Sequence, residues 1–179
     1  MVIPNGVPDP ARSHALLDAR GSIRDSLGVP PDATIIGSVG RLSCEKRVDL
    51  VLAAAHRLAP DRPDIHVLVV GGGDQRTELE MLTKRLGLAR RVTFTGLLRD
   101  VTPALIVMDV LIQPSDTEGT PRSVLEAMAH RLPVVATDVG DVAELLDQGR
   151  CGELVAPVML ACSPMRSGVF SPTQLALGT

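Results

Sequence analysis

The sequence predicts an α/β protein built on a Rossmann-like, doubly wound parallel sheet of about six strands with helices on both faces. Short apolar runs rich in Val and Ile recur along the chain, and segments with helical spacing of apolar residues separate them. Continuous apolar runs, rather than alternating ones, are typical of parallel strands that are buried on both faces. Glycine or proline follows most segments, as expected where elements end.

The first half of the chain alternates between helices and strands. Its first helix is closed by Gly28 and Pro30, its second stops before Pro60, and its third is closed by Gly87. The strands between these helices are β-branched runs, and the second of them ends in glycines. We therefore expect helices over 11–27, 48–59 and 75–88, and strands over 34–40, 64–73 and 91–96.

The second half continues the alternation with shorter elements. A threonine and a proline at 120 and 121 mark a helix start, and the run PVVAT after it is a strand-like segment. We expect helices over 101–108, 121–131 and 141–147, and strands over 109–115, 133–137 and 152–157. In such sheets ligands bind beyond the carboxyl ends of the strands, so the loops after each strand are the candidate sites.

Length and patterning indicate one domain with two flanking segments. The 179 residues fit a domain of about 100–200 residues. Residues 1–10, which are punctuated by prolines, are expected to be a linker, and 11–157 a Rossmann-like domain. Residues 158–179 carry no clear helical pattern, and we expect an atypical, loose C-terminal tail.

Composition excludes several classes of protein. A net charge of −3, with no Trp or Tyr and two Phe, argues against a nucleic-acid partner, since neither a basic surface nor stacking platforms are available. No apolar run approaches the roughly 18 residues of a transmembrane helix, and the start MVIPNGV is unlike a signal peptide. Three widely spaced cysteines favour reduced thiols over a disulfide framework, which predicts a cytoplasmic setting.

The loop after the first strand contains two candidate anion-binding cations. Gly40 permits a tight exit from the strand, Arg41 follows at the strand's carboxyl end, and Lys46 precedes the next helix. A cation at a helix start is disfavoured by the helix dipole unless an anion is shared between the ammonium and the helix amides. The two open interpretations are phosphate binding and a solvated basic loop paired with Glu45 or Asp49.

The glycine-rich loop after the second strand does not match a dinucleotide-binding fingerprint. Gly71, Gly72 and Gly73 are followed by Asp74, and Arg76 occupies the place of the last glycine of G-x-G-x-x-G. We therefore interpret this loop as a tight turn with a helix N-cap at Asp74.

The loop after the fourth strand is the most informative one. Thr120 and Pro121 predict an N-cap and first helical position, so the amides of Arg122, Ser123 and Val124 would form an anion site that Gly119 leaves open to a ligand. Glu118 stands before this helix and Glu126 in its second turn. Taken singly, Glu118 is explained as a carboxylate that the helix dipole stabilises, and Glu126 as the partner of Arg122 in an i,i+4 pair. Taken together, the two carboxylates would contact different parts of an elongated ligand.

No metal site is expected. The four histidines (His14, His56, His66 and His130) lie on expected helices or a strand without the spacing of metal ligands, and no nucleophile elbow is present. Gly140 and Asp141, after the fifth strand, either close on a ligand or form a plain N-cap.

The constellation resembles the glycosyltransferases of family 4, the group 1 family of two-domain GT-B enzymes, and specifically their C-terminal, donor-binding half. The resemblance covers about 1–157 and runs through VIPNGV, GRLSCEKRVDLVLAAA, VLVVGGGD, RVTFTG, QPSDTEGTPRSVLEAMA, LPVVATDVGDVAELL and GELVAP. Its most specific part is a Glu-x7-Glu motif, here Glu118 and Glu126, combined with the upstream G-R-x4-K.

The resemblance implies a bacterial, metal-independent enzyme without a cofactor that transfers a sugar with retention from a nucleotide-sugar such as a UDP- or GDP-sugar. Arg41 and Lys46 would stabilise the leaving diphosphate, and Glu118 would contact the sugar; these three are the expected catalytic residues. Glu126 would bind the ribose. The remaining donor-site residues would be Gly40, Leu98 near the base, Gly119, Thr120, Pro121, Ser123 and Val124.

Three departures from the family pattern stand out. Arg131 replaces a glycine that closes a helix, Asp141 replaces a second glycine that would face the donor, and the segment after Pro157 lacks the family's further helices. The family's N-terminal, acceptor-binding domain is also absent from the match, so the expected partner is that domain or a chain that supplies it, through which the enzyme would reach a membrane peripherally.

Four hypotheses follow. The leading one is a donor domain of a retaining glycosyltransferase. The others are a nucleotide-sugar-binding module without turnover, a Rossmann oxidoreductase, against which the failed glycine fingerprint counts, and a truncated fragment that binds nothing.

Overall fold

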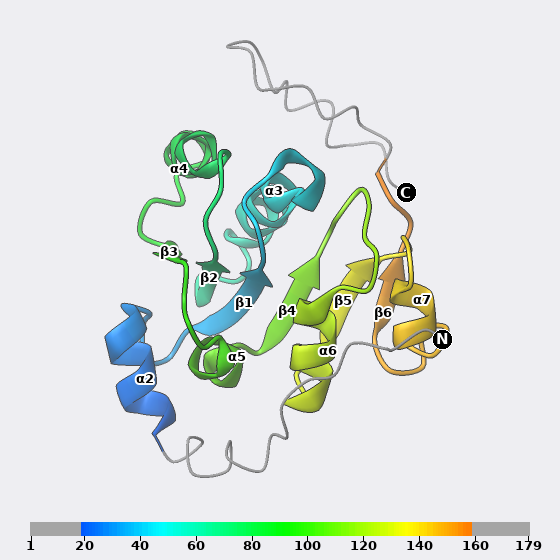
Figure 1. The fold of residues 1–179 in the computed structure, drawn as a ribbon. Helices are drawn as coiled ribbons and strands as arrows, with labels where there is room; N and C mark the ends of the chain where they lie inside the picture. The colour runs from blue at the N-terminus through cyan, green and yellow to red at the C-terminus, as the bar shows by residue number, and fades with distance from the viewer. Residues whose placement is uncertain (1–18, 159–179) are drawn as a thin grey trace.

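The six apolar runs form the strands of one parallel sheet in the computed structural model, which describes residues 19–158 (Figure 1). This confirms the predicted fold class. The strands are β1 (Thr34–Val39), β2 (Ile65–Val70), β3 (Val92–Gly96), β4 (Val110–Gln113), β5 (Val134–Thr137) and β6 (Glu153–Val155).

Helices connect the strands at the expected places. They are α2 (Arg20–Leu27), the 3₁₀ turn η2 (Cys44–Lys46), α3 (Val48–Leu58), α4 (Arg76–Arg85), α5 (Thr102–Val107), α6 (Arg122–Ala129) and α7 (Val142–Leu145). The expected linker 1–10, the start of the first expected helix and residues 159–179 of the expected tail lie outside the described residues.

The strand order is β3-β2-β1-β4-β5-β6, and every neighbouring pair is parallel. The chain moves outward from β1 to β3 and then returns to place β4 on the other side of β1, so the winding direction reverses between β1 and β4. Gly37 pairs with Leu111, and the carboxyl ends Val39 and Gln113 are therefore level. Ligands of doubly wound sheets bind at such a reversal, beyond the carboxyl ends.

Two apolar clusters cover the two faces of the sheet. One joins α2, α5, α6 and α7 to the sheet, and the other joins α3 and α4 to the opposite face. Neighbouring residues of β1 alternate between them: Ile35 belongs to the first cluster and Ile36 to the second. The central strands β1 and β2 are thus buried on both sides, which explains their nearly continuous apolar runs.

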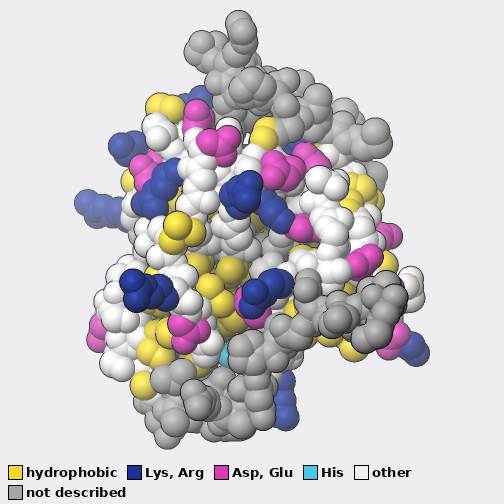
Figure 2. All heavy atoms as spheres, in the orientation of Figure 1, with side chains coloured by type: hydrophobic (Ala, Val, Ile, Leu, Met, Phe, Trp, Pro, Cys, Tyr) yellow, Lys and Arg dark blue, Asp and Glu magenta, His cyan; other side chains and the backbone are white. Residues whose placement is uncertain are grey.

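The surface carries charges of both signs. On the face in Figure 2 the described Lys and Arg side chains lie among Asp and Glu side chains, without a broad patch of one sign. Within residues 19–158 no helix is long and apolar enough to cross a membrane. Of the described cysteines, Cys151 is exposed and free.

Candidate functional site

The loops that leave β1, β4 and β5 come together beyond the carboxyl ends of the strands (Figure 1). The amide of Asp116, after β4, donates to the carbonyl of Glu45, after β1, at 2.8 Å. The amide of Asp141, after β5, donates to the carbonyl of Gly119 at 3.2 Å. The candidate site is therefore assembled from segments up to about a hundred residues apart, at the reversal of the sheet.

Lys46 and Glu118 form the central ion pair of this region. The ammonium Nζ donates to both carboxylate oxygens of Glu118, at 2.6 and 2.7 Å. The Glu118 side chain is 6% exposed and the Lys46 side chain 23% exposed, so the pair is shielded but reachable from the Lys46 side. Lys46 is thus not a merely solvated cation, because its partner is Glu118, 72 residues away, whereas Arg47 of the same loop pairs with Asp49.

Two further side chains fix the Glu118 carboxylate. Gln113 Nε2 and Ser115 Oγ both donate to its Oε1 at 2.6 Å, and Ser123 Oγ donates to Gln113 Oε1 at 3.1 Å. Gln113 and Ser115 are buried, and sequence reasoning missed both. The signal that could have found them is a pair of polar residues at the end of an otherwise buried strand, since buried polar groups need partners.

The opposite half of the site carries a basic and a glycine-rich element. Arg41 and Gly40 are exposed at the end of β1. The pKa of Glu45 is lowered, first because Ser43 donates a hydrogen bond to it and further through the charges of Lys46 and Arg41. Arg41, Ser43 and Lys46 thus give this loop two cations and a hydroxyl, a set of side chains that suits an anion.

The start of α6 differs in detail from the expectation. Pro121 is the N-cap, the helix begins at Arg122, and no side chain caps it. Thr120, expected as the cap, instead donates its hydroxyl to Asp141. That correction has a physical reason: α7 approaches the loop, and its carboxylate competes for the Thr120 hydroxyl. The first amides of α6, from Arg122 to Val124, therefore receive no side-chain cap, as an anion site requires.

The remaining residues of the expected donor set lie around this helix start. Gly119 is exposed, and no atom lies within 4 Å of the place a Cβ would take. Glu126 lies one turn into α6, 18% exposed, and accepts a hydrogen bond from Arg122 at 3.3 Å, which is the i,i+4 pair considered above. Val124 is buried in the core, so only its backbone could meet a ligand.

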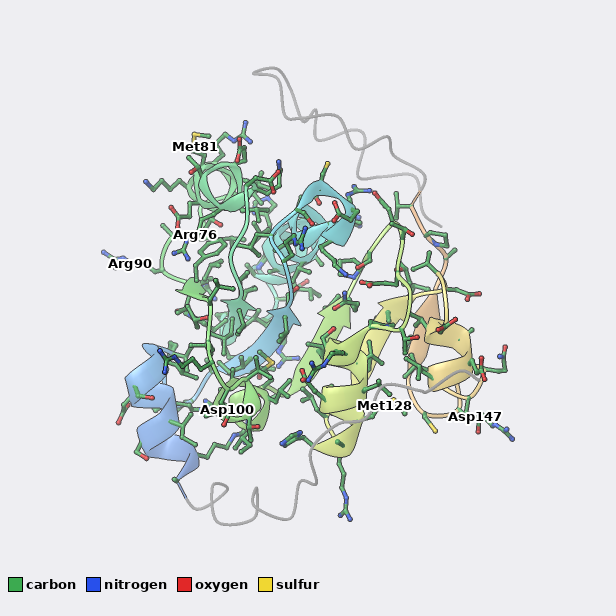
Figure 3. The ribbon with its side chains drawn as sticks, viewed as in Figure 1. Arg76, Met81, Arg90, Asp100, Met128 and Asp147 are labelled. Atoms are coloured by element: carbon green, nitrogen blue, oxygen red, sulfur yellow. The ribbon has the colours of Figure 1, made fainter. Side chains whose placement is uncertain are left out.

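The glycine-rich segment after β2 serves close packing of two loops. A Cβ on Gly71 would lie 1.8 Å from the Gly40 carbonyl oxygen, and one on Gly73 2.2 Å from that of Leu42. Arg76 is engaged elsewhere: it binds Glu80 at 2.7 Å and its guanidinium lies 5.5 Å from the centre of the Phe94 ring (Figure 3). The N-cap of α4 is Gln75, not Asp74 as expected, and again no side chain caps the helix.

The loop after β3 presents one apolar side chain to solvent. Leu97 is 84% exposed and lies beside Gly72, whereas Leu98, the expected donor-site residue, packs against the first core cluster. In this loop the Leu97 side chain therefore faces solvent, whereas the Leu98 side chain faces the core.

Gly140 and Asp141 act together at the start of α7. Asp141 is the helix N-cap, but its carboxylate accepts from Thr120 and does not cap its own helix. Gly140 has φ 57°, and a Cβ there would lie 2.1 Å from the Glu118 carbonyl oxygen. The loop after β5 thus packs directly against the backbone of Glu118 and Gly119.

No group of three or more His, Cys, Asp or Glu side chains that could hold a metal ion occurs within residues 19–158. His56 contacts the Leu86 carbonyl, His66 contacts Thr93, and His130 contacts the Glu126 carbonyl. His14 lies outside the described residues.

The comparisons with known proteins agree on one family. The family model described as "Glycosyl transferases group 1" matches residues 33–161. A 2-deoxystreptamine glucosyltransferase from Streptomyces kanamyceticus is 35% identical over 163 residues, which are 89% of this chain and 42% of the relative. The chain thus spans less than half the length of that relative.

Solved structures give the same picture. WaaG, a glycosyltransferase involved in lipopolysaccharide biosynthesis, is similar with a TM-score of 0.75 and 28% identity over 86% of this chain and 41% of that one. Anabaena Alr3699/HepE in complex with UDP-glucose has a TM-score of 0.72 and 30% identity over 78% and 39%. A C-terminal domain of a group 1 glycosyl transferase, LpcC from Francisella tularensis, has a TM-score of 0.67 and 28% identity over 77% and 74%.

Proposed function

This chain belongs to the glycosyl transferases of group 1, and from that premise we propose that it is a donor-binding domain that holds a nucleotide-diphosphate sugar for retaining transfer to an acceptor. The observation that carries the proposal is the Lys46–Glu118 pair, which stands beyond the carboxyl ends of β1 and β4 where the sheet reverses. A solved relative of the same fold was crystallised with UDP-glucose, which supports a nucleotide-sugar as the ligand.

Arg41 and Lys46 are proposed to bind the donor diphosphate. Both cations lie on the loop after β1, and Arg41 is exposed with its fork available for phosphate oxygens. Negative charge grows on the leaving nucleotide as the glycosidic bond breaks, so fixed cations at this place lower the barrier without a metal ion. The uncapped amides of Arg122, Ser123 and Val124 at the start of α6, together with the amide of Thr120, add donors for a phosphate. Pro121, which has no N–H, contributes by fixing the direction in which the helix starts.

Glu118 is proposed to contact hydroxyls of the transferred sugar and Glu126 those of the ribose. Glu118 is held by Gln113 and Ser115, so its carboxylate is oriented before a sugar arrives. When the donor phosphate binds Lys46, the ammonium leaves the Glu118 carboxylate, whose oxygens can then accept hydrogen bonds from sugar hydroxyls. Gly40 and Gly119 leave room for the backbone to approach the ligand, and the loop with Leu97 and Leu98 borders the base.

Transfer itself is proposed to need a second half that carries the acceptor site. The chain corresponds to 42% of the length of the glucosyltransferase described above, so the acceptor is assigned to a part that this match does not cover. A module that binds nucleotide-sugars without turnover has the same residues, and only transfer activity separates the two.

Calorimetric titration of the chain with UDP-glucose, GDP-mannose and ADP-glucose, with NAD as the control ligand, tests the proposal. We expect one nucleotide-sugar to bind and NAD not to bind. The Arg41→Ala/Lys46→Ala variant should lose diphosphate affinity but keep its weak affinity for the nucleoside, whereas Arg90→Ala, an exposed arginine after α4 (Figure 3), should behave like wild type.

Variants of the two carboxylates assign the ends of the donor. Glu126→Ala should weaken the binding of the free nucleotide and of the nucleotide-sugar alike, whereas Glu118→Ala should weaken mainly the binding of the nucleotide-sugar. Equal loss of nucleoside and nucleotide in the Arg41/Lys46 variant would contradict the diphosphate assignment. Binding without transfer, after addition of a complementing acceptor domain, would favour the binding module.

A further inference from the structure

Arg47 has a backbone conformation that its side-chain type disfavours. It follows η2 directly, serves as the N-cap of α3, and has φ 49° and ψ 40°, in the left-handed region. Residues that carry a Cβ are disfavoured there, because the Cβ crowds the backbone. Because the conformation is unfavourable for arginine, the contacts of its side chain must compensate.

The guanidinium of Arg47 is buried, and among the described residues it contacts one carboxylate on α3 and one on the loop after β4. Its side chain is 6% exposed, and Nε and Nη2 bind both carboxylate oxygens of Asp49, on α3, at 3.1 and 3.2 Å. Nη1 binds Asp116 Oδ1, on the loop after β4, at 3.0 Å. Burial would lower the pKa of Arg47, but the hydrogen bonds and charges of Asp49 and Asp116 raise it above its ordinary value.

Asp116 is held by the loop after β1 at two points. Its amide donates to the Glu45 carbonyl at 2.8 Å, and its carboxylate accepts from Arg47. Lys46 stands between Glu45 and Arg47 in sequence, and its partner Glu118 stands two residues after Asp116. The two attachments therefore flank Lys46 on one loop, and both meet Asp116, two residues before Glu118, on the other.

We propose that Arg47 is a positioning residue: by tying the loop after β4 to the loop after β1, it sets where Glu118 stands relative to Lys46 and hence the geometry of the donor site. The role in donor binding rests on the function proposed above. Sequence patterns do not reveal it, because neither the left-handed backbone of Arg47 nor its partner 69 residues away is encoded locally.

Two single variants and their combination test the attachment. Arg47→Gly removes the guanidinium at a backbone position that glycine adopts without strain, and Asp116→Asn removes the opposite charge with little change in size. Arg20→Ala is the matched control, since it removes an arginine that pairs with Asp109 at 2.6 Å at the amino end of the sheet. The measurements are hydrogen exchange by mass spectrometry and calorimetric affinity for UDP-glucose.

We expect Arg47→Gly and Asp116→Asn each to speed exchange in the loop 114–121 by about tenfold while peptides of β2 and β5 stay unchanged. Each should weaken UDP-glucose binding by about fivefold to tenfold, and the double variant should be no weaker than the worse single one. Arg20→Ala should leave both the loop exchange and the affinity unchanged.

The direction of the affinity change in each variant distinguishes a positioning role from a purely electrostatic effect. Arg47→Gly removes a positive charge and Asp116→Asn a negative one, so a purely electrostatic effect on an anionic donor would weaken binding in the first and strengthen it in the second. Such opposite shifts, or loop exchange equal to that of Arg20→Ala, would overturn the proposal. If wild type fails to bind UDP-glucose, the proposed function fails for that donor, and the exchange data alone decide whether Arg47 holds the loop.

Discussion

At the scale of single residues, the site depends on a shielded carboxylate that accepts hydrogen bonds from several donors at once. Glu118 receives the Lys46 ammonium, the Gln113 amide and the Ser115 hydroxyl, while its side chain is 6% exposed. A carboxylate removed from water this far is stable only with such partners. The same partners that stabilise the fold therefore prepare the group for a polar ligand.

Replacing Lys46 by Met tests the energetic weight of the pair. Lys46→Met keeps the apolar stem and leaves Glu118 with two neutral donors, so we expect the free energy of unfolding to fall by about 1–3 kcal/mol. Glu118→Gln should cost less in the Lys46→Met background than in wild type, because a neutral amide needs no cation. Chemical denaturation of the four proteins measures this; strictly additive costs would mean that the pair contributes no coupling.

His66 gives the protein a predicted acid sensitivity. It is 4% exposed on β2, contacts Thr93 at 2.9 Å, and burial together with the charge of Arg91 lowers its pKa to about 4. Between pH 6.5 and 4 the unfolded chain binds a proton that the folded chain does not, so stability falls as the pH falls through this window. The loss should approach about 3 kcal/mol at its lower end.

Denaturation of wild type and His66→Gln between pH 7 and 4 isolates this effect. The variant should lose most of the slope in that window, while carboxylates such as Asp64, whose pKa is lowered mainly by its hydrogen bond from Arg62, titrate below it. Parallel slopes for the two proteins would show that folding does not lower the pKa of His66.

At the scale of elements, most boundaries were predictable within one to three residues, because alternation of apolar runs and glycine or proline stops is a local signal. What the sequence could not give was pairing across loops. The pairing of Lys46 with Glu118 was not expected from the loop after β1 alone, and Thr120 was expected to cap α6 but binds Asp141. Gln113 and Ser115 were missed because their function depends on a neighbouring loop that strand periodicity does not reveal.

The end of α6 carries the strain that its sequence predicts. Arg131 follows the C-cap His130, is exposed, and has φ 56°. Arg131→Gly should raise the free energy of unfolding by about 0.5–1 kcal/mol, because glycine adopts this conformation at no steric cost. Arg90→Gly, at an exposed position without a positive φ, should not stabilise the protein. Thermal unfolding compares the two, and equal shifts would contradict the strain argument.

Alanine should destabilise the protein at one glycine of two adjacent loops and be tolerated at the other. Gly140→Ala would drive a Cβ to 2.1 Å from the Glu118 carbonyl oxygen at a φ of 57°, so we expect a loss of stability of about 2 kcal/mol or more. Gly119→Ala places a Cβ in open space and should leave stability within about 0.5 kcal/mol of wild type. If Gly119 faces the donor, the second variant should nevertheless weaken nucleotide-sugar binding. A stable Gly140→Ala protein would show that the loop after β5 shifts without cost.

At the scale of the whole molecule, one sheet joins two apolar clusters, and the candidate site lies where its winding reverses. The fold class and the position of the site follow together from the strand order, since only the reversal brings the loop after β1 next to the loop after β4. A ligand bound there touches loops that leave strands in the middle of the sheet.

Donor binding should therefore stabilise the whole sheet and not only its loops. A nucleotide-sugar at about 100 times its Kd should raise the free energy of global unfolding by about 2.7 kcal/mol, because it binds the folded chain alone. Hydrogen exchange should then slow in β1 and β4 as well as in the loop 114–121, whereas NAD at the same concentration should slow neither. Unchanged unfolding at that concentration would contradict selective binding of the donor to the folded chain, because any such binding raises the free energy of global unfolding.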